Sequence, residues 1–246
     1  MKNNPKIFIF FLILFINISL SLKVNGSEVF NFDVTEAEIN NSGNIFLGKK
    51  GGIATSEDGT TIKANDFKYD KILNILYANG NVIVNDVVNN IKIFTEDITY
   101  LKNEEIIFTK SRTKATDDIV TIEGNEFEYK KNLNILNATG NVKIDDIQKD
   151  YQINAEDITY LKNQEKIYTK GDTIAKIQSK YDFNSSDVLL LRDKMELISN
   201  NKSTIKDDDN TLYQLDEFKF FINKEVLKGK NILVITNYLK PKSDKI

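Results

Sequence analysis

The sequence predicts an all-β fold built from antiparallel strand-turn-strand units that repeat about every 30 residues. Three observations predict it. A motif of an acid, an apolar residue, any residue and a second apolar residue recurs along the chain. Apolar and polar residues alternate on both sides of short polar clusters, which is the period of a half-buried strand. No stretch after residue 26 sustains the apolar spacing of an amphipathic helix, so helices are predicted to be minor at most.

The first segment, residues 1–26, is predicted to be a signal peptide. Two lysines precede an apolar stretch that begins at Ile7, and Gly26 offers a small residue where a signal peptidase would cut. The strongest apolar part ends at Ile16, short of the roughly 20 residues that span a bilayer, so an uncleaved anchor is the less favoured interpretation. We therefore expect an exported protein.

Residues 27–246 are predicted to form a single domain, because the repeats cover them without a break. Residues 62–110 match residues 122–170 at 27 of 49 positions without a gap, which identifies a duplication. The acids of the recurring motif follow one another at steps of 30, 31, 29, 31, 30 and 30 residues. These acids are Glu36, Asp66, Asp97, Glu126, Asp157, Asp187 and Glu217. Seven units leave no room for a second domain.

Within the units, polar clusters rich in Lys, Asn, Asp and Glu separate the alternating runs and predict turns. A second kind of break is a slip in the alternation. Ile93 and Ile98 are an odd number of residues apart, which predicts a bulge or bend at residues 95–97. The same slip falls between Ile153 and Ile158.

The composition excludes several functional classes. The chain has no His and no Cys, which removes imidazole and thiol chemistry, disulfides and ordinary zinc sites. The 33 Lys and Arg against 36 Asp and Glu provide no basic footprint, so no nucleic-acid partner is expected. No cofactor and no metal site is predicted, and Asp207-Asp208-Asp209-Asn210 is interpreted as a solvated turn because it lacks the spacing of a calcium loop.

Two adjacent acid pairs, Glu96-Asp97 and Glu156-Asp157, are the best candidates for catalysis, because glycoside hydrolysis uses two carboxylates. Neighbours on one strand point to opposite faces, however, and the pairs recur with the repeat. We therefore predict that the protein is not an enzyme and keep an exported glycan-active enzyme as an unfavoured alternative.

The repeated unit resembles the OstA-like repeat of the lipopolysaccharide-transport family. It consists of apolar-x-Ala, Asp or Glu, apolar-x-Tyr, a polar turn, and then apolar-x-Ala-x-Gly-Asn-Val-x-apolar. Residues 62–84 and 122–144 match it best, and fainter copies extend from about Phe30 to about Val234. The resemblance implies an antiparallel jelly roll of two sheets opened into a V. Its apolar cleft would take the acyl chains of lipopolysaccharide in the periplasm, as part of outer-membrane assembly, without a cofactor.

Two branches of that family stay open as alternatives. One is the free bridge protein LptA, and the other is the N-terminal periplasmic region of the assembly protein LptD, which is associated with the outer membrane. The length favours the second, in which a β-barrel would follow the C-terminal end. Both alternatives imply lipopolysaccharide and other transport proteins as partners.

The repeated apolar positions would line the cleft that the resemblance implies. They are Phe67, Tyr69, Leu73, Ile75, Ile98, Tyr100, Phe127, Tyr129, Leu133, Ile135, Ile158 and Tyr160. Burial of acyl chains against them would contribute roughly 25 cal/mol per Å² of apolar area. The same alternation fits a closed core, so an open cleft and a packed core are both compatible with the sequence.

The ends of such a sheet would leave strand edges with unpaired backbone groups. Phe30, Phe32 and Val34 are predicted to lie on the N-terminal edge, where an upstream module would add a strand, and the segment from Leu215 to Tyr238 would form the other edge. A structural β-solenoid or adhesin fragment is the remaining alternative. It would show parallel coils, whereas the transport module would show antiparallel hairpins.

Overall fold

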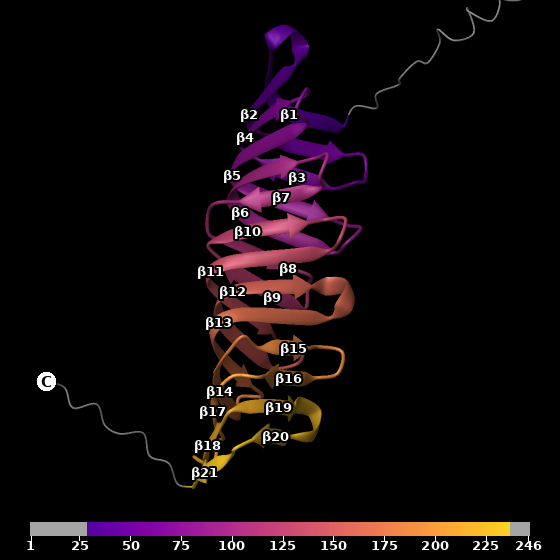
Figure 1. Ribbon diagram of the computed structural model, residues 1–246. Helices are drawn as coiled ribbons and strands as arrows, with labels where there is room; N and C mark the ends of the chain where they lie inside the picture. Colours follow the sequence, from indigo (N-terminus) through magenta and orange to yellow (C-terminus); the bar gives the residue numbers. More distant parts are fainter. Residues whose placement is uncertain (1–28, 237–246) are drawn as a thin grey trace, which may run out of the picture.

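The computed structural model describes residues 29–236, so the predicted signal peptide, residues 1–26, lies outside the described residues. This part of the chain forms 21 β-strands and three short 3-10 helices, and all the strands belong to one sheet. Figure 1 shows the strands stacked along a long axis, with β1 near one end and β20 and β21 near the other. Within residues 29–236 no helix has the length and apolar character that a membrane crossing requires.

Every strand pairing in the described sheet is antiparallel. The prediction of an all-β, antiparallel fold is therefore confirmed. The alternative of a β-solenoid is wrong, because its coils would pair in parallel.

Seven long strands bend in the middle. They are β1 (Phe30–Asn40), β2 (Ile45–Ser56), β5 (Ile75–Asp86), β6 (Ile91–Leu101), β11 (Ile135–Asp146), β12 (Tyr151–Leu161) and β13 (Lys166–Ile177). The register of β5 shifts between Asn79 and Val82, opposite residues 95–97 of β6. The same shift falls between Thr139 and Val142 of β11. A bulge at this position bends the strand, so the bend predicted from the slip in alternation is confirmed.

The bends divide the sheet into two half-sheets, each completed by seven short strands. The first half-sheet contains β4 (Asp66–Asp70), β7 (Ile106–Thr109), β10 (Glu126–Lys130), β15 (Leu189–Leu191), β16 (Glu196–Ser199), β19 (Glu217–Phe221) and β20 (Val226–Lys230), with the 3-10 turns η1 (Asn41–Gly43), η2 (Lys162–Gln164) and η3 (Ile222–Lys224). The second contains β3 (Thr61–Ala64), β8 (Thr113–Thr116), β9 (Val120–Gly124), β14 (Tyr181–Ser186), β17 (Ser203–Lys206), β18 (Leu212–Leu215) and β21 (Leu233–Ile235).

The two half-sheets lie face to face and share one apolar core. Alternate residues of each strand point inward, as β5 illustrates: Leu76 is buried and its neighbour Tyr77 is exposed. The core runs from Phe30 at one end to Ile222 near the other. Inward side chains of both half-sheets meet and fill the space between them, so the described residues do not form the open V-shaped cleft that the resemblance implied.

Candidate functional site: the apolar interior and its polar seam

Eight of the twelve apolar residues predicted to line a cleft lie in the interior. Each has at most 5% of its surface exposed, and all sit on the first half-sheet, on β4, β6, β10 and β12. They are Phe67, Tyr69, Ile98, Tyr100, Phe127, Tyr129, Ile158 and Tyr160. All eight belong to the single cluster of buried apolar residues, so they form part of a packed core.

The other four predicted lining residues lie outside the interior. Leu73 and Leu133 are at turn tips, 60% and 54% exposed, and Ile75 and Ile135 are half-buried on the outer face. The reason is the turn conformation. Asn74 and Asn134 adopt a positive φ. In the strand that follows Asn74, Leu76 and not Ile75 is paired with the inward Tyr69.

The sequence-based list also missed the inner face of the second half-sheet. This face is mostly aliphatic, with buried aromatic rings at Phe30, Tyr151 and Phe183, and it is as deeply buried as the inner face of the first half-sheet. The same period-two alternation could have revealed it. The main members are Ile62, Val84, Ile93, Ile122, Ile144 and Ile153.

Tyrosine hydroxyl groups mark the long side of the molecule opposite the bends. Tyr129 Oη donates to Asp86 Oδ2 at 2.9 Å, and Tyr160 Oη donates to Asp117 Oδ2 at 3.2 Å. Both tyrosines belong to the first half-sheet, whereas both carboxylates belong to turns of the second. Each ring therefore packs in the apolar core while its hydroxyl bridges the two half-sheets.

Each aspartate that accepts a hydroxyl group also accepts a backbone N–H group of its own turn. Oδ1 of Asp86 accepts the backbone N–H of Asn89 at 3.1 Å, which closes the turn after β5, and Oδ2 faces Tyr129. Asp117 repeats the arrangement, with its Oδ1 accepting the N–H of Val120 at 2.8 Å. A carboxylate buried with both oxygens occupied is a fixed acceptor for the opposite half-sheet.

Lys131 forms the first of two buried cationic contacts between the half-sheets. Its side chain is 3% exposed, and its Nζ lies 2.5 Å from Asp58 Oδ2 and 2.7 Å from Thr60 Oγ1, both on a turn of the second half-sheet. Nζ also lies 3.4 Å from Glu105 Oε2 and donates to Tyr100 Oη at 3.3 Å. The ammonium group therefore has charged and neutral acceptors around it, as a buried cation requires.

Arg192 forms the second contact. Its guanidinium group donates from Nη2 to Asp146 Oδ2 at 3.1 Å and from Nη1 to Glu165 Oε2 at 2.6 Å. Nε donates to Tyr151 Oη at 2.9 Å, and Nη1 donates to Tyr160 Oη at 2.7 Å. Asp146 is fully buried, so this ion pair is shielded from solvent. We call the row of contacts from Asp58–Lys131 to Asp146–Arg192, with the Tyr–Asp bridges between them, the polar seam.

The surroundings fix the protonation states along the polar seam. Burial raises the pKa of Tyr100, Tyr129 and Tyr160 above the ordinary value, and neighbouring carboxylates raise it further, so the hydroxyls stay protonated donors. Burial alone would raise the pKa of Asp58, but hydrogen bonds from Lys131 and Ser56 outweigh it and hold that pKa well below its usual range.

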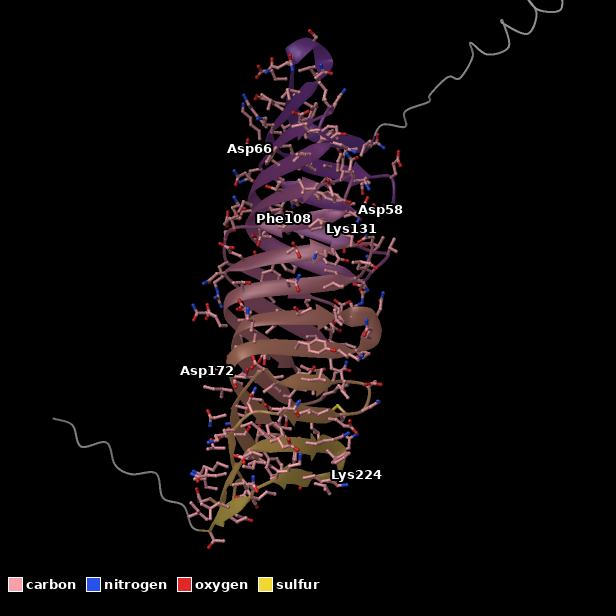
Figure 2. All side chains as sticks on the ribbon, viewed as in Figure 1. Asp58, Asp66, Phe108, Lys131, Asp172 and Lys224 are labelled. Atoms are coloured by element: carbon pink, nitrogen blue, oxygen red, sulfur yellow. The ribbon has the colours of Figure 1, made fainter. Side chains whose placement is uncertain are left out.

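The polar seam lies on the long side that faces away from the bends. Figure 2 shows Asp58 and Lys131 together on this side and Asp66 and Asp172 on the opposite side. Strands join the half-sheets at the bends, and hydrogen bonds and ion pairs join them at the seam. The interior is consequently enclosed along both long sides.

The two ends of the described sheet differ from its long sides, because they are formed by edge strands. Within residues 29–236 each terminal strand pairs with a single neighbour: β1 with β2, β20 with β19 and β21 with β18. The predicted C-terminal edge runs on to Tyr238, which lies outside the described residues. The predicted edge residues lie on β1. Phe30 packs against Tyr69 at a ring-centroid distance of 5.1 Å, and Phe32 stacks on Phe46 at 4.2 Å, while Val34 is half-buried. These side chains point inward, and no strand of the described part of the chain lies beside the second backbone edge of β1.

Apolar inner-face residues are accessible at both ends. Ile39, paired with Phe46 on β2, is 64% exposed, and Val234, paired with Tyr213 on β18, is 50% exposed. Toward the middle of the described sheet the equivalent positions are buried. The apolar interior therefore continues to both end surfaces.

The acid pairs considered for catalysis lie at the bends and bind backbone groups. Glu96 Oε2 accepts the N–H of Asn81 at 3.3 Å, and Asp97 Oδ2 accepts the N–H of Lys110 at 3.1 Å. Glu156 repeats the first contact with Asn141 at 3.5 Å. These positions explain why the pairs recur with the repeat.

The fold and the enclosed apolar interior define an elongated antiparallel β-protein, and comparison with known proteins adds a similarity to solved structures. No family model and no curated protein matches the chain. Eighteen chains of solved structures match it. One is the crystal structure of LptH, the LptA homologous periplasmic component of the conserved lipopolysaccharide transport device from Pseudomonas aeruginosa. It has 16% sequence identity and a TM-score of 0.41, over 45% of this chain and 82% of that chain.

Proposed function

We propose that this chain is a periplasmic lipid-binding module that carries lipopolysaccharide toward the outer membrane with the acyl chains in its interior. The observation that carries the proposal is the apolar interior that runs the length of the sheet and reaches both end surfaces, at Ile39 and Val234. The repeat that resembles the OstA-like unit supports the same function. This proposal needs the interior to open, because its side chains are packed in the described state.

The energetics of opening favour a lipid as the ligand. Separating the half-sheets removes apolar contacts, but acyl chains that enter replace them with contacts of the same kind. In both cases the free energy is roughly 25 cal/mol per Å² of apolar surface buried. The apolar terms therefore nearly cancel. What is left is the free energy of breaking the polar seam, which lies at only one of the two long sides.

Strand pairing at the ends is part of this proposal. Among residues 29–236, the backbones of β1, β20 and β21 each pair along one side only, which suits the addition of a strand from another transport protein. In this arrangement the exposed inner-face residues of one module would meet those of the next, and the apolar interior would continue between modules. A barrel that follows the C-terminal edge would extend the same path.

Photo-crosslinking tests the interior as a lipid site. A photoreactive residue in place of Tyr100 or Tyr160, which point inward, should capture lipopolysaccharide. Tyr77 and Tyr168 are matched controls, since they lie on the outer face and are 41% and 38% exposed. Equal capture at all four positions, or capture at the outer two alone, would exclude the interior as the site.

A second candidate function is a structural rod, and the observation that favours it is the packed interior itself. A rod would bind no lipid at any position. Absence of crosslinks at Tyr100, Tyr160 and the aliphatic positions of the second half-sheet would favour this candidate over transport.

A further inference from the structure

Five cationic residues occupy the same position in successive units of the first half-sheet. Each follows an inward apolar residue by two positions and begins a turn on the seam side. They are Lys71, Lys102, Lys131, Lys162 and Arg192, and in the last unit Ile222 takes the position. The equivalence is structural as well as sequential, because the residue at this position is placed by the same backbone bond in each unit.

That bond fixes the spacing of the row. The backbone N–H of Lys131 donates to the carbonyl of Glu105 at 2.9 Å, where Glu105 ends the preceding turn, and the N–H of Arg192 donates to Glu165 at 2.8 Å. The same bond joins Lys102 to the preceding turn at 3.1 Å. Successive turns are two strands apart, so the cations stand roughly 10 Å from one another along the molecule.

The row stands at the boundary between the apolar interior and the surface. The side chains of Lys131 and Arg192 are 3% and 4% exposed. Lys131 pairs with Asp58 and Arg192 pairs with Asp146, both from the second half-sheet. Lys162 also reaches across, with its Nζ donating to the carbonyl of Asn89 at 2.7 Å. Parting of the seam would separate these cations from Asp58, Asp146 and the carbonyl of Asn89. Glu105 and Glu165 lie on the first half-sheet and would stay beside the row.

We propose that this row is a binding track for the phosphate-type anionic head group of an amphiphile whose chains enter the interior. The inference rests on the proposed function and adds a polar site to it. In the closed state Asp58 and Asp146 occupy the places that the ligand's anion takes when the seam opens. Lysine and arginine both bind phosphate oxygens strongly, and arginine can do so with two parallel hydrogen bonds. The track ends at Ile222, before the C-terminal edge.

Calorimetric titration with matched detergents tests the track. Dodecyl phosphate and dodecyl maltoside share one chain and differ in charge, and each is used below its critical micelle concentration. The parent should bind dodecyl phosphate at least about tenfold more tightly than the maltoside. Lys102→Gln and the charge-matched pair Lys131→Gln/Asp58→Asn should each lower that preference. Maltoside affinity should not fall in either variant, and it should rise in the pair, because the seam is then easier to open.

Two further measurements complete the test. Lys114→Gln, on the exposed outer face of β8, should change neither affinity, and inorganic phosphate alone should bind far more weakly than dodecyl phosphate. Far-UV circular dichroism checks the fold of each variant. If Lys131→Gln/Asp58→Asn does not fold, Lys102→Gln alone carries the test, because Glu105, the partner of Lys102, is partly exposed.

The outcomes separate the track from the proposed function. Equal affinity for both detergents, unchanged by the variants, would overturn the track while lipid binding stands. Inorganic phosphate binding as tightly as dodecyl phosphate would overturn the assignment to an amphiphile. Binding of neither detergent would overturn both proposals.

Discussion

Replacing Arg192 by Met should destabilise the protein far more than the same change at Arg112. Arg192 donates four hydrogen bonds, two of them to carboxylates, and its loss leaves Asp146 as a fully buried negative charge without its cation. Removing one partner of a buried ion pair costs about 3–5 kcal/mol. Arg112 pairs with Glu123 at 3.3 Å on the surface, with 57% of its side chain exposed, and such pairs contribute about 0–1 kcal/mol.

Thermal and urea unfolding, followed by far-UV circular dichroism, measure the difference. A loss of this size at Arg192 corresponds to a fall in Tm of roughly 6–20 °C for a chain of about 200 residues. The double variant Arg192→Met/Asp146→Asn should lose less than the two single variants added together, since the neutral amide at position 146 no longer carries the unpaired charge.

The reasoning fails if Arg192→Met and Arg112→Met unfold at the same temperature and urea midpoint. That result would mean that the seam contributes no stability at this point and that the half-sheets are held by core packing alone. Additive losses in the double variant would show that Arg192 and Asp146 are not coupled.

Three further predictions concern the core, the bend and acid stability. Leu76→Ala should lower the free energy of unfolding by about 2–5 kcal/mol and Leu73→Ala by less than about 0.5, because only the first removes a buried side chain; equal urea midpoints would contradict the assigned inner face. Gly140→Ala should cost at least about 1 kcal/mol in the same assay, since this residue has a φ of +79°; an unchanged midpoint would show that the bend tolerates a side chain. The folded pKa of Asp58 lies below its unfolded value of about 4, so its contribution to stability is present above that pH and is lost as pH falls further. Tm should therefore drop between pH 5 and pH 3 by less in Asp58→Asn than in the parent, and identical pH profiles would contradict the assigned ion pair with Lys131.

The bends show how much a slip in the alternation can predict. An odd separation between two inward residues, Ile93 and Ile98, requires one extra residue in the ladder, and the register shift opposite residues 95–97 is the result. The residues that line the interior were harder to predict from the sequence. Leu73 and Ile75 alternate with the polar Asn74, which favours an inward position for both, but the positive φ of Asn74 decides that Leu76 points inward instead. A turn conformation of this kind follows from local hydrogen bonding, which periodicity does not encode.

The sequence by itself determined the repeat, the antiparallel hairpins, the positions of the bends and eight inward residues of the first half-sheet. These depend on contacts between neighbours in the chain or on the period-two geometry of a strand. The tertiary structure alone decided that the interior is closed. Lys131 meets Asp58 across 73 residues, and Arg192 meets Asp146 across 46, because the half-sheets face one another after every strand has bent. Such long-range pairs depend on how the whole sheet folds over itself, and no local pattern in the chain specifies them.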